Sequence, residues 1–263
     1  MLLNLREYHR PAVAAPNRSL AYALELLARP GIRTAVLAGG DTLLASADPA
    51  VEAVVDLQGM ALDFIRVADD GAGLRIGALA TRAALADHAA ARDLCAGLLA
   101  EGARRWGGSV QRNRATVGGA VATGATNDPL LAALLACDAE VVLAEPAGTF
   151  TLPLAEFLAR RTTLLAAPAI IVELRMPQPR PRTGGALAVV ARTPADAPIV
   201  VAAATVQRAG ERCGAADLAL GGVAETPLAR RAAVTDLIGR PWAAAAVAEA
   251  AARAAAGLQP IGD

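Results

Sequence analysis

A chain of 263 residues is long enough for one large domain or two smaller packed domains, and none of its apolar runs reaches the roughly 18 to 20 residues that a membrane helix needs. Its 25 basic and 25 acidic side chains are interspersed, so no overall field attracts nucleic acid or an anionic membrane. Because the sequence has no lysine, it excludes Schiff-base chemistry and a Walker-type phosphate loop.

Cysteine and histidine are too few and too scattered for a metal centre. Cys95, Cys137 and Cys213 have no CxxC spacing, so we interpret them as buried free thiols. His9 and His88 alone do not support a catalytic triad or a metal site. We therefore predict no metal ligand and no catalytic side chain, and redox work would need an organic cofactor. Residues 1–7 lack the basic head and apolar stretch of a secretory signal, so we expect a cytoplasmic location.

The first part of the chain predicts a small parallel α/β unit. A helix is expected over residues 19–28, with Ser19 as its cap and Pro30-Gly31 at its end. A strand at residues 34–37 runs into a glycine turn, and a valine-rich strand follows at 51–57. The order of strand, turn, helix and strand is typical of parallel pairing.

A second subdomain is expected from about Met60. Two short apolar runs flank Asp69-Asp70-Gly71, which is good turn chemistry for a hairpin. Gly71, Gly73 and Gly77 imitate a dinucleotide fingerprint, but their spacing is wrong and they do not open a helix. The expected elements are strands at 64–67 and 74–77, helices at 82–89 and 94–105, an irregular glycine-rich passage over 107–126, a helix over 128–135, and strands at 140–143 and 170–176.

The proline-rich segment 176–181 has no periodicity and is interpreted as a connector between domains. Beyond it a smaller domain of strands and helices is expected. Its predicted elements are strands at 186–191, 199–207 and 217–221, and helices at 227–238 and 241–256.

Two loops contain paired glycines. Gly39 and Gly40 follow a strand directly, and glycine there lets backbone N–H groups approach a phosphate without interference from a Cβ atom. Gly118 and Gly119 follow a polar segment, and their N–H groups could approach a phosphate in the same way. Each loop alone is also compatible with an ordinary turn. Two of them in one chain favour a long ligand that is phosphorylated at its middle.

The combined pattern resembles the FAD-binding (medium) subunits of molybdenum hydroxylases, such as carbon monoxide dehydrogenase and xanthine dehydrogenase. The resemblance covers nearly the whole chain, and its motifs are specific only in their order. They are Tyr8-His9-Arg10-Pro11, residues 37–44, Val54-Val55-Asp56-Leu57, residues 76–81, the loop over 112–119, and residues 134–141.

This resemblance implies an α+β fold. A vanillyl-alcohol-oxidase-like (PCMH-type) FAD-binding domain would cover residues 1–177, with subdomains at about 1–58 and 59–177, and a smaller C-terminal α/β domain would cover 183–263. FAD would lie between the two subdomains. The implied cofactor-binding residues are Val36, Leu37, Ala38, Gly39, Gly40, Asp41, Thr42, Leu43, Trp106, Thr116, Val117, Gly118, Gly119, Ala120, Asp128 and Ile171.

The residues themselves leave some of these roles open. Trp106 also suits packing at a helix end, and Asp128 also suits an N-cap one residue short of the family register. Ala120 stands where relatives often have asparagine, and Ala188 where they have lysine or an aromatic residue against the flavin. The chain stops at Asp263, before a tyrosine-arginine pair expected from relatives.

The resemblance also implies partners. Electrons would pass from the 2Fe–2S clusters of a small iron–sulfur subunit through FAD to an external acceptor, and a large molybdopterin subunit would hydroxylate the substrate. A dimer of such heterotrimers is expected. Two alternatives stay open: a non-catalytic scaffold subunit that has lost flavin, and a self-contained flavoprotein oxidase.

Overall fold

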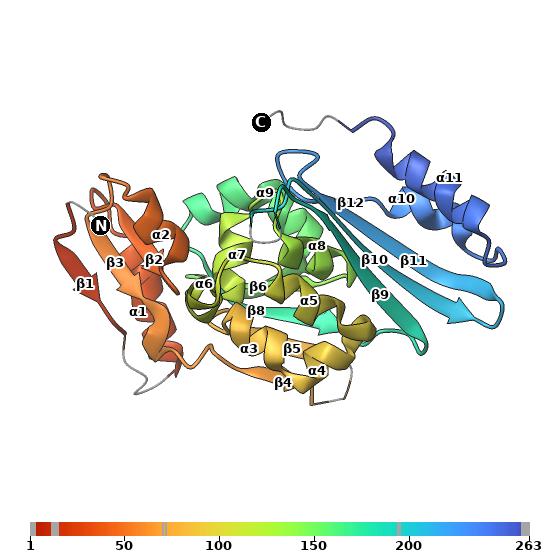
Figure 1. Cartoon of the computed structure of the whole chain (residues 1–263). Coiled ribbons are helices and arrows are strands. Elements are labelled where there is room, and N and C mark those ends of the chain that lie inside the picture. The colour runs from red at the N-terminus through yellow and green to blue at the C-terminus, as the bar shows by residue number, and fades with distance from the viewer. Residues whose placement is uncertain (1–3, 12–15, 70, 72, 194–195, 259–263) are drawn as a thin grey trace.

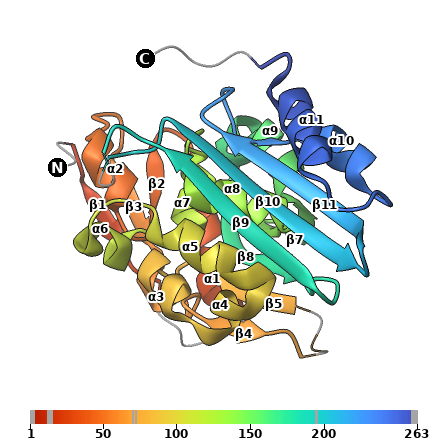
Figure 2. The ribbon, with the colours of Figure 1, turned by 45° about the vertical axis from the view of Figure 1, so that its right-hand side comes forward.

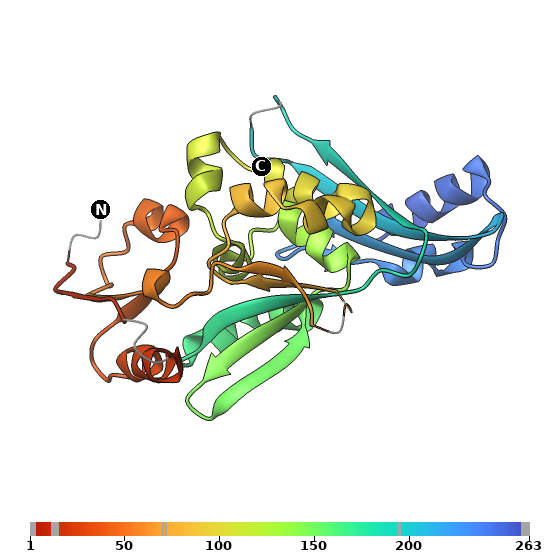
Figure 3. The same cartoon turned by 90° about the horizontal axis from the view of Figure 1, so that it is seen from below.

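The computed structural model describes residues 4–11, 16–69, 71, 73–193 and 196–258. The chain ends and Asp70 of the predicted hairpin turn lie outside these residues. In the described part, three sheets follow one another along the chain, with helices packed between them (Figure 1). Seen from below, they also follow one another in space from one end of the molecule to the other (Figure 3).

The first sheet is the predicted parallel unit with one additional strand. Strand β3 (Ala53–Asp56) lies in the middle and pairs in parallel with β2 (Thr34–Leu37) and β1 (Glu7–His9). The additional strand is β1. All four residues of β3 are buried, as expected for a central strand covered on both faces. The glycine turn after β2 leads into the short helix α2 (Asp41–Ser46).

Helix α1 (Pro16–Leu27) attaches the first sheet to the second. It begins three residues before Ser19, so Ser19 lies inside the helix and is not its cap, contrary to the prediction. Proline suits a helix start because its missing N–H would have no intrahelical partner there. The helix packs into a cluster of Ala23, Leu24, Leu26, Val55, Leu57, Met60, Leu79, Ala144 and Ile170.

The second sheet has five antiparallel strands in the order β4-β5-β8-β6-β7. Its predicted hairpin is present, and the N–H of Gly71 donates to the carbonyl of Ala68 at 2.8 Å. One strand was not predicted, although its residues 149–152 alternate polar and apolar side chains. Only Leu152 of its six residues is buried. The strands are β4 (Ile65–Val67), β5 (Gly73–Gly77), β6 (Glu140–Glu145), β7 (Gly148–Pro153) and β8 (Ile170–Pro177).

Helices cover one face of this sheet. The passage over 107–126, predicted to be irregular, contains two short helices, and the predicted helix over 94–105 is interrupted by a kink at Cys95 and Ala96, both with left-handed backbone angles. The helices are α3 (Arg82–Asp87), α4 (Ala89–Asp93), α5 (Leu98–Arg104), α6 (Ser109–Arg114), α7 (Val117–Thr123), α8 (Pro129–Ala136) and α9 (Leu154–Ala166), with 3-10 turns at Leu57–Gly59 and Leu94–Gly97.

Helix α8 lies at the centre of the main core. All eight of its residues are buried, and it contacts the third sheet through β10 and β11. A helix that is apolar all round is one that is covered on every side. The third sheet therefore shares a core with the second, although the proline-rich connector separates them in sequence.

The third sheet is antiparallel in the order β12-β11-β10-β9, and Figure 2 shows its three long strands side by side. The helices that follow are shorter than predicted. Described helices are all too short or too polar to cross a membrane. The elements are β9 (Thr183–Val190), β10 (Val200–Ala209), β11 (Arg212–Gly221), β12 (Leu228–Ala229), α10 (Arg231–Val234), a 3-10 turn at Thr235–Leu237 and α11 (Ala244–Ala255).

Candidate cofactor site

Two adjoining cavities lie where the first sheet meets the second. One has a volume of about 330 Å³ and is bordered by β2, α7 and the start of β8. The other has a volume of about 320 Å³ and is bordered by the turn into α2, by α7 and by residues ahead of α8. Val36, Ala38, Gly119 and Ala122 line both cavities. A ligand longer than either cavity can therefore extend through both.

The turn between β2 and α2 offers unpaired backbone donors. The amides of residues 39–43 have no acceptor within the described part of the chain, and the first hydrogen bond of the helix is from Leu44 to the carbonyl of Gly40, at 3.2 Å. Gly40 has a φ of 74°, a left-handed angle that favours glycine. Adjacent free N–H groups carry partial positive charge, so this turn suits an anionic group such as a phosphate.

Gly39 is required by the second loop rather than by a ligand. A Cβ atom on it would lie 1.7 Å from the carbonyl oxygen of Arg114, far inside any contact distance. The two glycine-pair loops therefore touch backbone to backbone at this point. A further contact joins them, because the hydroxyl oxygens of Thr42 and Thr123 lie 3.2 Å apart.

The second loop differs from the first in its amides. The N–H of Val117 donates to Ala80 at 2.8 Å, and that of Gly118 donates to Ala78 at 2.8 Å. Gly119 donates to the hydroxyl of Thr116, which caps α7. The prediction that the N–H groups of Gly118 and Gly119 are free for a phosphate is therefore wrong, because both are already paired within the protein. Its glycines instead allow close packing, since a Cβ on Gly118 would lie 2.6 Å from that of Ala78.

A buried ion pair borders the second cavity. The carboxylate of Asp128 accepts from Nη1 of Arg82 at 3.0 Å and also from Nη2, and both side chains are almost completely buried. Asp128 also accepts from the N–H of Leu130 at 2.9 Å, which confirms its predicted N-cap role. The indole of Trp106 lies over the guanidinium of Arg82, with 4.7 Å between Cζ and the ring centroid.

Arg82 is the residue of this site that the sequence did not single out. It is the first residue of α3, where a positive charge opposes the helix dipole, and that unfavourable placement was the available signal. Its N–H donates to the carbonyl of Ala115 at 2.9 Å, which attaches it to the second loop. Its Nε is buried and has no hydrogen-bond partner among the described residues.

Most of the predicted site residues lie together. Leu37 and Val117 line neither cavity, because their side chains pack into apolar clusters. Ala188 lies exposed on β9 and lines neither cavity. Gly118 and Ile171 line the first cavity only. The second cavity alone is lined by Gly39, Gly40, Asp41, Thr42, Leu43, Trp106, Thr116, Ala120 and Asp128.

The motif around Tyr8 and His9 supports the site from outside. The hydroxyl of Tyr8 donates to the buried carboxylate of Asp56, which accepts from the N–H of Gln58 at 2.9 Å. The side-chain amide of Gln58 in turn donates to the carbonyl of Ala38 at 3.3 Å, and Ala38 borders both cavities.

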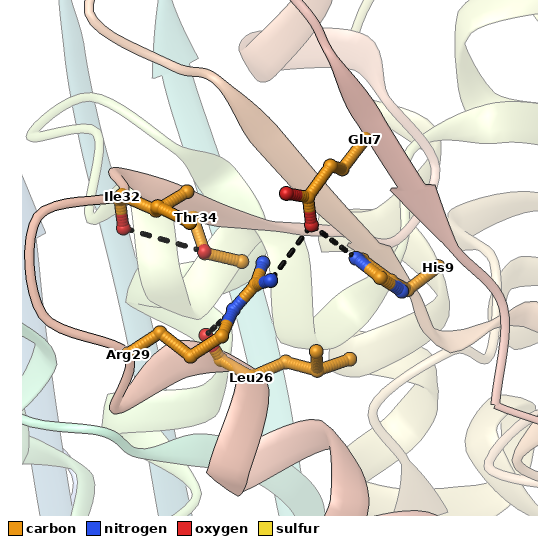
Figure 4. A network of polar contacts seen from close by, with 6 residues as sticks. All are labelled: Glu7, His9, Leu26, Arg29, Ile32 and Thr34. Carbon is orange, nitrogen blue, oxygen red and sulfur yellow. Dashed lines mark hydrogen bonds and ion pairs between the residues drawn. The ribbon is translucent and has the colours of Figure 1, made fainter.

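The other face of β1 is tied to α1 (Figure 4). Oε2 of Glu7 lies 2.7 Å from Nε2 of His9 and 2.7 Å from Nη1 of Arg29. Hydrogen bonds from His9 and then from Arg29 lower the pKa of the Glu7 carboxyl. These contacts place the first sheet rather than any ligand.

Both parts of the chain match known families. Residues 7–179 match the FAD binding domain in molybdopterin dehydrogenase, and residues 185–263 match the CO dehydrogenase flavoprotein C-terminal domain. The fold is thus that of a flavoprotein. The chain belongs to the family of FAD-binding subunits of molybdenum hydroxylases.

Individual relatives agree with this assignment. The chain is 30% identical to the carbon monoxide dehydrogenase medium chain of Hydrogenophaga pseudoflava and 27% identical to that of Afipia carboxidovorans, covering 98% of this chain and 88% of each relative. A solved structure of the Hydrogenophaga pseudoflava enzyme superposes with a TM-score of 0.90 over 100% of this chain and 90% of that one. Quinoline 2-oxidoreductase from Pseudomonas putida 86, at 24% identity and a TM-score of 0.85, shares the fold.

The site fits FAD on its own geometry. The unpaired amides of residues 39–43 suit a diphosphate, and the joined cavities suit a cofactor with a ring system at each end. The orphaned Nε of Arg82 is a further polar atom beside the second cavity that the protein leaves without a partner. FAD is accordingly the cofactor of this chain.

Proposed function

We propose that this chain is the electron-transfer subunit of a molybdenum-containing hydroxylase. Electrons would pass from 2Fe–2S clusters of a small partner subunit through FAD to an external acceptor, and a large molybdopterin subunit would hydroxylate the substrate. The observation that carries the proposal is the pair of joined cavities with free amides at residues 39–43. The likeness to carbon monoxide dehydrogenase medium chains over nearly the whole chain supports it.

Different residues along the cavities would contact different parts of the cofactor. The amides of residues 39–43 would hold the diphosphate, because they are the free donors of the site. Ile171 lies in the first cavity and Trp106 in the second, so they would contact opposite ends of one extended cofactor. The loop over 116–120 would contact the cofactor between these ends mainly through its surface, since the amides of residues 117–120 are paired within the protein.

A redox role of this site needs no side-chain acid or base. FAD supplies the redox chemistry when bound, and the protein supplies position and electrostatics. A scaffold that has lost flavin finds no support here, because the amides of residues 39–43 are free and the cavities are open.

Copurification tests the proposal. The chain, expressed together with the neighbouring genes of its operon and purified through a tag on this chain, is expected to bring down an iron–sulfur and a molybdopterin subunit. Substrate added under anaerobic conditions should then bleach the flavin band near 450 nm. A chain that binds FAD but purifies alone and oxidises a substrate by itself would instead be a self-contained oxidase.

A further inference from the structure

Arg82 occupies a position at the cofactor site that neither the glycine loops nor the family motifs account for. It is 1% exposed, and it lines the second cavity beside Trp106 and Asp128. Trp106 is half-buried. A buried guanidinium at a cavity wall needs a reason, since arginine is rarely buried unless it is paired.

The guanidinium is fixed in both position and plane. Two of its nitrogens donate to the carboxylate of Asp128, and a bidentate pair of this kind sets the orientation of the guanidinium plane. Cζ of Arg82 lies over the indole of Trp106, 4.7 Å from the ring centroid. Since a cation attracts the face of an indole ring, fixing the guanidinium also fixes the ring.

Asp128 itself has little capacity left for a ligand. Its carboxylate accepts from Arg82 through both nitrogens and from the N–H of Leu130. Arg82, by contrast, keeps Nε unpaired. We therefore infer that Asp128 affects the cofactor through Arg82 and, through it, the indole of Trp106.

We propose that Arg82 is the positioning residue of this site: held by Asp128, it fixes one face of the Trp106 indole, so that the other face stacks on an aromatic ring of FAD in the second cavity. This inference rests on the proposed cofactor site. Isoalloxazine and adenine share the required chemistry, because both are flat aromatic systems.

The test is a double-mutant cycle on FAD affinity in the full chain carrying Trp242→Phe. The sequence has only two tryptophans, and Trp242 lies outside the site, so Trp106 becomes the sole indole emitter. Replacing both charges in Arg82→Met/Asp128→Asn avoids an unpaired buried charge, and the asparagine oxygen can still accept from Leu130. Arg92→Met/Asp87→Asn is the matched control, because it removes an exposed arginine–aspartate pair.

We expect the site variant to bind FAD about tenfold more weakly, the loss of one good stacking contact. It should also show less quenching of Trp106 emission at saturation, while the control binds within twofold of the parent. With Trp106→Leu as the background, Arg82→Met/Asp128→Asn should change the dissociation constant by less than twofold. If the site variant also binds FMN more weakly than the parent, the ring stacked on Trp106 is isoalloxazine. If only FAD binding is weakened, that ring is adenine.

Equal FAD affinity and equal quenching in the site variant would overturn the inference, and so would a full tenfold loss that persists without Trp106. If the site variant does not fold, as judged by circular dichroism without FAD, Arg82→Lys provides the same comparison with the charge kept and the planar pair lost. A parent protein that binds no FAD would refute the cofactor site itself, which is a separate result.

Discussion

Thr42 on α2 and Thr123 at the end of α7 face each other with their hydroxyl oxygens 3.2 Å apart, and either can be the donor. One follows the turn with unpaired amides, and the other ends the helix that begins in the second loop. The contact therefore joins the first subdomain to the second at the edge of the second cavity. It sets the separation of the two loops that a bound diphosphate would meet.

Thr42→Val should weaken FAD binding by about fivefold, because it removes a hydrogen bond worth about 1 kcal/mol while keeping the shape of the side chain. The melting temperature should change little, since Thr42 is exposed. Thr123→Val should have the same effect, and fluorescence titration with FAD measures both. The double variant should lose no more than either single variant. Additive losses would mean that the two hydroxyls act independently.

Gly39→Ala should nearly abolish FAD binding. The added Cβ would overlap the carbonyl oxygen of Arg114, so the two loops must separate before it can be accommodated. Equilibrium dialysis with FAD measures the loss. Gly108→Ala is the control, because nothing lies within 4 Å of a Cβ placed there and its φ of −79° suits alanine. Similar affinities for the two variants would show that close contact of the loops is not needed.

The glycines of the two loops show which features could be predicted from the sequence and which could not. Paired glycines after a strand predicted a turn at Gly40, and the turn is present with a left-handed φ and free amides, which follow from local chain geometry. Its binding of a phosphate stays a prediction. For Gly39 and Gly118 the reason was different. Each lies against backbone from another segment, and local sequence does not reveal which segment will be its neighbour.

The ion pair of Arg82 and Asp128 could not be predicted from the sequence for the same reason. Its partner Asp128 is 46 residues away, so no local pattern links the two. Asp128 was predicted as an N-cap because capping depends only on the residues that follow it. Helix α9 was not predicted, although its buried Leu154, Phe157 and Leu158 have helical spacing.

Glu173 provides a prediction about pH. It lies between Arg75 and Arg175, which stand opposite each other on β5 and β8, and it accepts from their Nε atoms at 2.7 and 2.9 Å. Burial raises the pKa of the Glu173 carboxyl, but the hydrogen bonds from both arginines outweigh burial, and the pKa lies below its ordinary value of 4.5. Because the unfolded chain then binds the proton more readily, this stabilisation is present above pH 4.5 and is lost as the pH falls below it.

Glu173→Gln should therefore lower the free energy of unfolding at pH 7 by about 2 kcal/mol, since it leaves two facing arginines without their carboxylate. The difference from the unsubstituted protein should shrink between about pH 5 and pH 3. Urea unfolding at several pH values measures it. Glu156→Gln, which removes an exposed helical pair with Arg160, should change stability by less than about 0.5 kcal/mol. A pH-independent difference for Glu173→Gln would contradict the assigned ion pairs.

One FAD is expected to extend through both cavities, and Ala122 offers the most direct test because it borders both. Titration of the purified chain with FAD, followed by flavin fluorescence, should give one FAD per chain. Ala122→Phe should bind none, because the ring would fill the passage between the cavities, whereas Ala251→Phe on the exposed side of α11 should bind normally. Undiminished, stoichiometric FAD binding by Ala122→Phe would contradict the claim.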